Sequence, residues 1–290
     1  MAARRQRNRQ RRRRGRFGFL YKLLSFLIVF AAILVGCVVF FRVNKVEVVG
    51  NNRYSVEEVI AASGVEIGEN LFLVSRPRTN SSLIQRLPYI QKVAMVRRLP
   101  DTIEFQITES AAAAVVEAED IQWVIDPRGK LLEVLEPSEN VFAEGLPRVL
   151  GLTPMAPTVG TMMSASVEEQ TRLEVLRGLL SALNDRGMTG ELSEFIDLRA
   201  ANVVYFGYGG ELTVVVPMEE DQSWYAFALQ RVLEKLHQQG ERVTGTLYLT
   251  YGEERASLLP ERWLPQDVDT KGDVSYGPDS GVDADIEFQE

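Results

Sequence analysis

The chain has 290 residues, a formal net charge of -8 at neutral pH, one cysteine and one histidine. A single cysteine excludes a disulfide scaffold and a zinc site built from several cysteines, so any folded part must be stabilised by its own apolar core. The charge is unevenly distributed. The first 22 residues carry ten arginines and lysines and no acid, which leaves a net charge of -18 on the rest of the chain.

An apolar run of nineteen residues without a charge extends from Leu23 to Phe41. A helix of that length rises roughly 28 Å, close to the hydrocarbon thickness of a bilayer. A secretory signal peptide also has a basic start and an apolar run, but its core is shorter and ends in small residues. Here the run ends in Phe40, Phe41 and Arg42, so we expect an uncleaved helix that spans the membrane once.

The basic segment at residues 1–22 lies directly against this helix. Arginine and lysine beside a first spanning helix are retained in the cytoplasm, so we expect a cytoplasmic N-terminus and an extracytoplasmic bulk, a single-pass type II arrangement. A dense arginine run also attracts nucleic-acid phosphates or anionic lipids. Its position favours the topological signal, and we expect no nucleic-acid partner.

The segment after the anchor predicts a compact β-α-α-β-β module, with both helices on one face of a three-stranded sheet. Ser55 and Glu58 have the spacing of a capping box, and Gly64 is placed to end the helix that they begin. The predicted elements are Val43–Val49, Ser55–Ala62, Ser81–Leu87, Ile90–Arg97 and Thr102–Thr108.

The following 150 residues predict a second, β-rich unit that also contains helices. A hairpin is expected at residues 121–134 and irregular loops and short strands at 137–163. A helix is predicted from a second capping box, Ser166 with Glu169, to Gly187. Strands at residues 195–198, 203–206 and 212–216, a helix from Trp224 to Gly240, and a last strand from Thr246 to Tyr251 complete the unit. Residues 266–290 are acidic and poor in apolar residues, so we expect disorder there.

Several motifs of the first module resemble the POTRA domain of the FtsQ/DivIB bacterial cell-division proteins. They are Val46-Glu-Val-Val-Gly50-Asn51, Tyr54-Ser55-x-Glu57-Glu58, Gly68-Glu-Asn70-Leu71-Phe72 and Leu99-Pro100-Asp101. The motif that usually ends the family's module departs here, as Glu109-Ser-Ala-Ala-Ala. The resemblance implies an α+β protein with a cytoplasmic tail (1–22), a transmembrane helix (23–41), a POTRA domain (42–116), a mixed β domain (117–265) and an acidic tail (266–290).

No catalytic motif stands out in the extracytoplasmic part, and His237 lies among polar residues of a predicted helix without a partner. We therefore expect a non-enzymatic protein without cofactor, metal or small-molecule substrate, which binds other proteins through an exposed strand edge. The strand Thr246–Tyr251 is the expected edge. The resemblance implies FtsB/DivIC-like and FtsL-like partners at the division septum, and the candidate contacts are Leu247, Leu249, Tyr251 and Trp263.

Two other functions are compatible with parts of this pattern. A POTRA module also occurs in polypeptide-transport and outer-membrane assembly systems, where a membrane barrel follows it. The region after Val116 instead shows helices and short strands rather than repeated alternating spans of about ten residues. An anchored cell-wall enzyme is the third hypothesis, and hydrolysis or cross-linking of peptidoglycan by the extracytoplasmic part would establish it.

Overall fold

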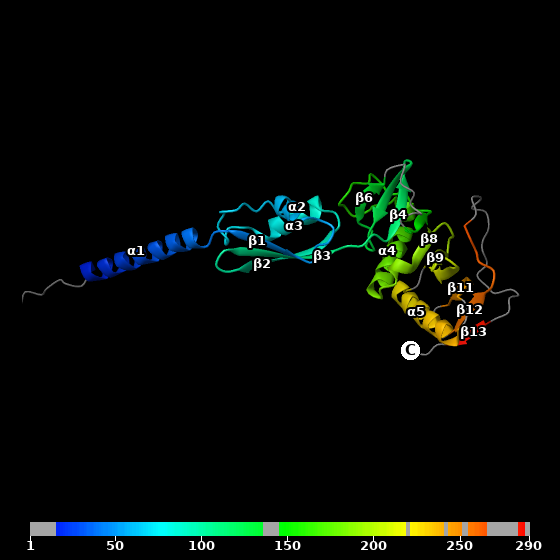
Figure 1. Cartoon of the computed structure of the whole chain (residues 1–290). Coiled ribbons are helices and arrows are strands. Elements are labelled where there is room, and N and C mark those ends of the chain that lie inside the picture. Colours follow the sequence, from blue (N-terminus) through cyan, green and yellow to red (C-terminus); the bar gives the residue numbers. More distant parts are fainter. Residues whose placement is uncertain are drawn as a thin grey trace, which may run out of the picture.

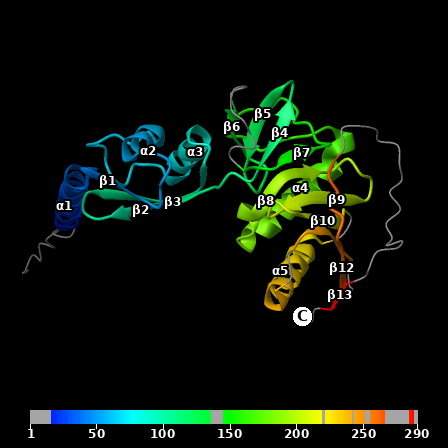
Figure 2. The ribbon, with the colours of Figure 1, turned by 45° about the vertical axis from the view of Figure 1, so that its right-hand side comes forward.

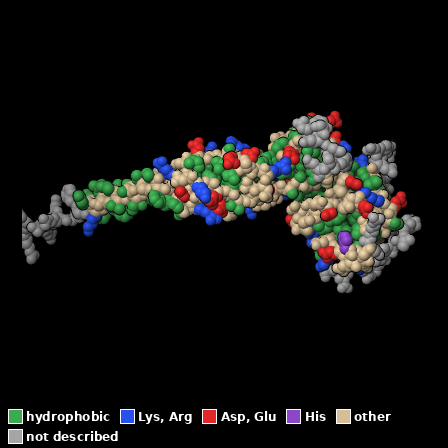
Figure 3. Space-filling view, in the orientation of Figure 1, with side chains coloured by type: hydrophobic (Ala, Val, Ile, Leu, Met, Phe, Trp, Pro, Cys, Tyr) green, Lys and Arg blue, Asp and Glu red, His purple; other side chains and the backbone are tan. Residues whose placement is uncertain are grey.

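A computed structural model describes residues 16–135, 145–218, 221–240, 243–250, 255–265 and 284–287. It begins with helix α1 (Arg16–Phe40), which stands apart from the rest of the chain as a rod of exposed apolar side chains (Figures 1 and 3). Its segment Phe19–Cys37 is long and apolar enough to cross a membrane. The helix starts before the predicted Leu23, because Phe19, Leu20 and Tyr21 extend the apolar surface by another turn.

The predicted β-α-α-β-β module follows directly, as strand β1 (Lys45–Val49), helices α2 (Val56–Ser63) and α3 (Arg76–Arg86), and strands β2 (Ile90–Arg98) and β3 (Thr102–Glu109). The sheet order is β1-β3-β2, with β1 parallel and β2 antiparallel to the central β3. Both helices cover one face of the sheet (Figures 1 and 2). The core between them is apolar and includes Val59, Leu83 and Phe105.

The ends of helix α2 agree with the predicted signals. The Ser55 hydroxyl accepts from the Glu58 N–H at 3.2 Å, and the Glu58 carboxylate accepts from the Ser55 N–H at 2.7 Å. Gly64 ends the helix with a positive φ of 69°. Helix α3 is longer than predicted, because Pro77 occupies its first turn, where a missing N–H costs no hydrogen bond.

The second unit is organised around one ten-stranded sheet in the order β13-β12-β11-β10-β9-β8-β7-β4-β5-β6. Its strands are β4 (Ala114–Ala118), β5 (Ile121–Ile125), β6 (Leu131–Leu135), β7 (Arg148–Leu150), β8 (Leu192–Asp197), β9 (Val203–Tyr208), β10 (Leu212–Pro217), β11 (Gly245–Leu249), β12 (Arg255–Leu259) and β13 (Ala284–Glu287). The predicted α+β class is confirmed. The domain boundary predicted after Val116 falls inside β4, which the structure places wholly in this sheet.

Helices α4 (Gln170–Asp185) and α5 (Gln222–Gln239) pack against each other, and their apolar sides share one core with the sheet. The capping box predicted at Ser166 does not form. Ser166 precedes a short 3-10 helix (Val167–Glu169), and its hydroxyl contacts the Glu169 carboxylate instead of a backbone N–H. Helix α5 does end at Gly240 as predicted, with His237 exposed in its last turn.

The two units meet around a buried lysine at the turn between β5 and β6. The Lys130 ammonium donates to the carbonyl oxygens of Ile84, Pro88 and Ile90 at 3.2, 2.7 and 3.1 Å. These carbonyls lie at the C-terminal end of α3 and the start of β2, where a helix dipole also favours positive charge. Burial lowers the pKa of the Lys130 ammonium, so the three acceptors replace much of the water that this charge has lost.

An ion pair and a tyrosine extend the contact between the units. Arg53 pairs with Glu133 at 2.8 Å, and its guanidinium lies 3.6 Å from the centroid of the Tyr89 ring. The Tyr89 hydroxyl donates to the other oxygen of Glu133 at 2.5 Å. Tyr89 is buried with Val115 and Leu132 in a separate apolar cluster. The first unit is therefore joined to the second by side chains as well as by the connecting chain.

Candidate partner-binding edge

The predicted edge strand is an interior strand of the large sheet. Strand β11 pairs in parallel with β10 on one side, through Val214 and Leu247, and antiparallel with β12 on the other, through Leu249 and Ala256. The prediction that residues 246–251 form the exposed edge is therefore wrong. Strand β12, just beyond this segment, covers that side of β11.

Leu247 and Leu249 are 0% and 1% exposed and belong to the core beneath helices α4 and α5. Neither side chain can touch a partner on the surface while the sheet is folded. The predicted alternation of this strand is confirmed, since Thr246 and Tyr248 point to the opposite face of the sheet. Tyr251 lies outside the described residues.

Trp263 lies on the face of the sheet opposite the two helices. Its ring stacks on Tyr205 with centroids 4.0 Å apart and meets Phe195 edge-on at 5.8 Å. Tyr248 packs against the same apolar cluster. Trp263 and Tyr248 are both half-buried, so they form a partly accessible aromatic surface next to β11.

Two buried threonines fix the segment that carries Trp263. The Thr213 hydroxyl donates to the Trp263 carbonyl oxygen at 2.6 Å. The Thr246 hydroxyl donates to the Glu261 carbonyl oxygen at 2.7 Å and accepts from the Trp263 N–H at 2.8 Å. Both threonines are essentially unexposed. The chain after β12 is thus held back across β11 and β10 instead of extending away from the sheet.

The outer side of β12 is occupied by β13, a short piece of the acidic C-terminal region. The pairing is antiparallel and matches Ala256 with Ile286 and Leu258 with Ala284. Figure 2 shows the two strands side by side at the end of the sheet, near the end of α5. Disorder was predicted for all of residues 266–290, and for Ala284–Glu287 the structure contradicts it. The rest of that region lies outside the described residues.

Comparisons with known proteins complete this description. A family model described as the POTRA domain, FtsQ-type, matches residues 41–110, which is the β1–β3 module. The cell division protein FtsQ of Corynebacterium glutamicum is 29% identical over 166 residues, 56% of this chain and 64% of the relative. DivIB of Clostridium acetobutylicum is 26% identical over 142 residues, 49% and 54% of the two chains. These matches support the FtsQ/DivIB family for this chain.

The matches to the FtsQ/DivIB relatives cover only part of the length of each chain. DivIB of Bacillus subtilis, for example, is 27% identical over 116 residues, 38% of this chain and 44% of the relative. The chain spans between about half and two thirds of the length of the first two FtsQ/DivIB relatives. The shared name, cell division protein, describes those relatives.

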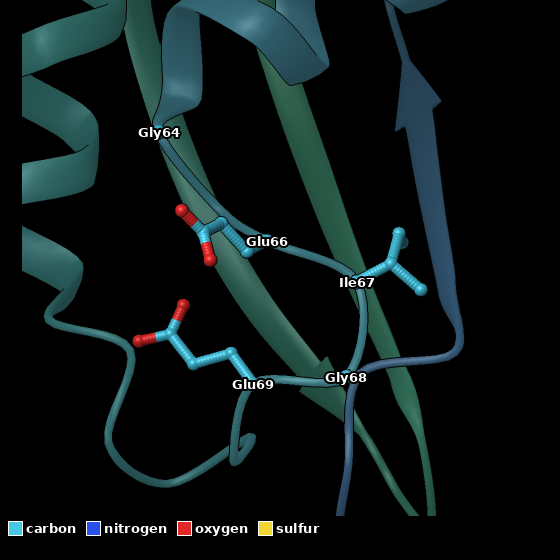
Figure 4. A pocket seen from close by; sticks show the side chains of 5 residues that line it. All are labelled: Gly64, Glu66, Ile67, Gly68 and Glu69. Carbon is cyan, nitrogen blue, oxygen red and sulfur yellow. The ribbon is translucent and has the colours of Figure 1, made fainter.

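No other site competes with this edge in the described parts of the chain. Those parts contain no group of three or more histidine, cysteine, aspartate or glutamate side chains able to hold a metal. An open hollow of about 550 Å³ lies in the loop after α2, lined by Gly64, Glu66, Ile67, Gly68 and Glu69 (Figure 4). The carboxylates of Glu66 and Glu69 point to the same side of that loop and Ile67 to the other, and two carboxylates alone make no site.

Sequence reasoning missed β12, although a local signal existed. Ala256 and Leu258 alternate with Arg255 and Ser257 shortly before Pro260, a pattern compatible with a half-buried strand. In the structure Ala256 is 1% exposed and Leu258 packs against the main core. The FtsQ/DivIB resemblance drew attention to the stronger pattern at Leu247–Tyr251, one strand too early.

Proposed function

We propose that the protein is a non-enzymatic, membrane-anchored scaffold of the bacterial division machinery. Its relatives carry the name cell division protein, and its α1 has the length and composition of a membrane span. In this proposal the arginine-rich start stays in the cytoplasm, and both folded units lie outside the membrane at the septum. The partners are FtsB/DivIC-like and FtsL-like single-pass proteins.

The proposed binding mode is addition of a partner strand to β12. The observation that supports it most is the strand β13, because it demonstrates that the outer side of β12 accepts an antiparallel strand. Without β13, this edge offers its main-chain N–H and C=O groups to any chain that can extend along it. The partner would take the place that Ala284–Glu287 occupies in the absence of one.

The backbone alternation identifies which residues of β12 face the partner. Gly245 donates to the Glu211 carbonyl on the β10 side at 3.2 Å, so Tyr248 directs its main-chain groups toward β12, where it opposes Ser257. Ala256, the neighbour of Ser257, therefore directs its N–H and C=O outward. Its main-chain groups are the ones a partner strand would bind.

The four predicted contact residues have different roles in this proposal. Tyr251 stays a proposed aromatic contact, on the basis of the family resemblance. Trp263 contributes through the half-buried aromatic surface that it forms with Tyr205 and Tyr248. Leu247 and Leu249 shape the strand from the core side, since their side chains are buried.

Two variants of the full-length protein test the edge, because they are expected to change co-purification with the partner in opposite directions. Ala256→Pro removes one outward N–H, and proline is tolerated on an edge strand, so co-purification with the FtsB/DivIC-like protein of the same organism should fall severalfold. Deletion of residues 266–290 removes β13 and should raise co-purification with the same protein severalfold. Unchanged co-purification in both variants, each with a wild-type unfolding temperature, would refute strand addition at β12.

A cellular test addresses the division role separately. A fluorescent fusion to the full-length chain should collect at mid-cell in growing bacteria, and cells depleted of the protein should elongate without dividing. An even signal around the envelope, with normal division after depletion, would contradict the proposed role. Hydrolysis of peptidoglycan by the purified protein would contradict its non-enzymatic character.

A further inference from the structure

Three chain segments meet at the end of the POTRA domain that adjoins α1. Residues 67–73 bond to the chain that leaves the helix, through Leu71 N–H to the Phe41 carbonyl at 2.9 Å and Val43 N–H to the Glu69 carbonyl at 2.8 Å. The β2–β3 turn joins them, through Asn44 N–H to the Asp101 carbonyl at 2.9 Å. No free linker therefore separates α1 from this end of the domain (Figures 1 and 2).

Large apolar side chains are exposed at this end. Ile67, Phe72, Leu73 and Leu99 have exposed fractions of 62, 54, 73 and 61%, and we call these four residues the proximal rim. At the far end of the same domain the exposed large apolar residues are the smaller Val49 and Val56, at 54 and 39%. Clustered exposed apolar side chains in a stable domain indicate a surface that is covered in the working protein.

An aromatic series connects the rim to the membrane helix. The Phe40 and Phe41 rings meet edge-on with centroids 5.4 Å apart, and the Phe41 and Phe72 rings meet edge-on at 5.3 Å. Phe40 is the last residue of α1, three residues beyond the candidate span Phe19–Cys37. Phe72 is thus connected through the Phe41 ring to the last residue of α1.

We propose that the proximal rim inserts into the headgroup region of the outer leaflet and fixes the tilt of the POTRA domain on the bilayer. The rim is continuous with the helix, and bulky apolar side chains at an interface gain free energy from leaving water. The occupant is lipid because the helix end brings the rim there without any partner. This inference rests on the proposed anchoring of α1 in the membrane.

Charged side chains of both signs surround the rim. Lys45 and Arg98 are paired with Glu47 and Glu104, each at 2.5 Å. Glu66 and Glu69 point together to one side of their loop, and Ile67 points to the other (Figure 4). The Arg97 guanidinium, next to the rim, donates to the carbonyl oxygens of Leu71 and Val74 at 2.8 and 2.6 Å. Positive charge at this end is therefore only partly paired with acids, and the proposal rests on the apolar side chains of the rim.

The single cysteine permits a direct test in the full-length protein, reconstituted one copy per phosphatidylcholine nanodisc. A spin label is placed on native Cys37, or on Leu73→Cys or Val49→Cys in a Cys37→Ser background. The accessibility of each label to oxygen and to a water-soluble nickel chelate is then measured. The label at position 73 is expected to resemble the label on Cys37, with high accessibility to oxygen. Its accessibility to nickel should be severalfold lower than that of the label at position 49, which is the matched exposed site at the far end.

The outcomes separate the two proposals. A Cys37 label open to nickel would overturn the membrane anchoring itself. A lipid-buried Cys37 label with a Leu73 label as open to nickel as Val49 would overturn the rim insertion alone. A Leu73 label shielded from both reagents would also overturn it, because the cover would then be protein. Leu99→Cys, on a different segment, must report the same environment as Leu73 if the rim inserts as a unit.

Discussion

The ammonium nitrogen of Lys130 lies 2.7 Å from the carbonyl oxygen of Pro88, so a buried charge of the β domain is solvated by the backbone of the POTRA domain. Pro88 has no N–H to donate to the Ile84 carbonyl four residues earlier, and that carbonyl accepts from Lys130 instead, at 3.2 Å. The contact joins two units whose sheets are otherwise separate.

Lys130→Met is expected to weaken this joint. The substitution keeps the volume but leaves the carbonyls of Ile84, Pro88 and Ile90 without this donor, and buried unsatisfied groups cost about 1–3 kcal/mol. Urea unfolding of the detergent-solubilised full-length protein should show a loss of that size. Lys92→Met is the matched control, because Lys92 is exposed, and it should change stability by less than about 0.5 kcal/mol. Equal effects of the two substitutions would rule out the joint.

Ser55→Ala and Ser166→Ala form a second matched pair. Ser55 caps helix α2 through its hydroxyl, whereas Ser166 makes no bond to a backbone N–H. Loss of a helix N-cap costs about 0.5–2 kcal/mol, so Ser55→Ala should lower the free energy of unfolding by that amount. Ser166→Ala should leave it nearly unchanged. Thermal unfolding followed by circular dichroism measures both, and the reverse order would contradict the observed capping.

Thr246→Val should loosen the segment that carries Trp263. The Thr246 hydroxyl is buried and bonds to both Glu261 and Trp263, so its removal leaves two main-chain groups without a partner and costs about 1–3 kcal/mol. Amide exchange at Trp263 should accelerate accordingly. Leu264→Ala is the control, because Leu264 is half exposed, and slow exchange in both variants would show that Thr246 does not hold the segment.

Alkaline pH should destabilise the β domain through Tyr208. Burial, with a smaller contribution from the charge of Glu191, raises the pKa of Tyr208 to about 12 from the ordinary value of 10.0. The unfolded chain then releases this proton more readily than the folded one, so stability is full below pH 10 and falls as the pH rises toward 12. Tyr208→Phe should show a shallower decline over that range in urea unfolding. Parallel declines of variant and wild type would exclude Tyr208 as a cause.

Local sequence patterns predicted the helices and strands of this protein better than they predicted which strands pair with one another. The capping box at Ser55 and the glycine at position 64 act within one helix, and both formed as the sequence indicates. The alternation at Thr246, Leu247 and Leu249 correctly separated the two faces of β11. Its position in the sheet was wrong, because that depends on β12 and on a strand 35 residues further along, and periodicity contains no information about distant pairing.

Prediction of the candidate binding edge from the sequence was limited for the same reason. A short strand such as β12 has few alternating positions, and the acidic surroundings of Ile286 resemble disordered sequence. Trp263 was predicted as a partner contact from the family resemblance, and its stacking on Tyr205 joins residues 58 positions apart, which no local pattern indicates. The contribution of Tyr251 and Trp263 to partner binding stays a prediction.

The parallel pairing of β1 with β3 determines how the POTRA domain carries mechanical load. Helix α1 leads into the start of β1 at Lys45, and the second unit follows the end of β3 at Glu109, which lies at the opposite end of the sheet. Tension applied between α1 and the second unit therefore acts along the strands, in shear, and the five paired positions from Lys45 to Val49 resist it together instead of opening one after another. The domain is connected as a force-bearing link between α1 and the ten-stranded sheet.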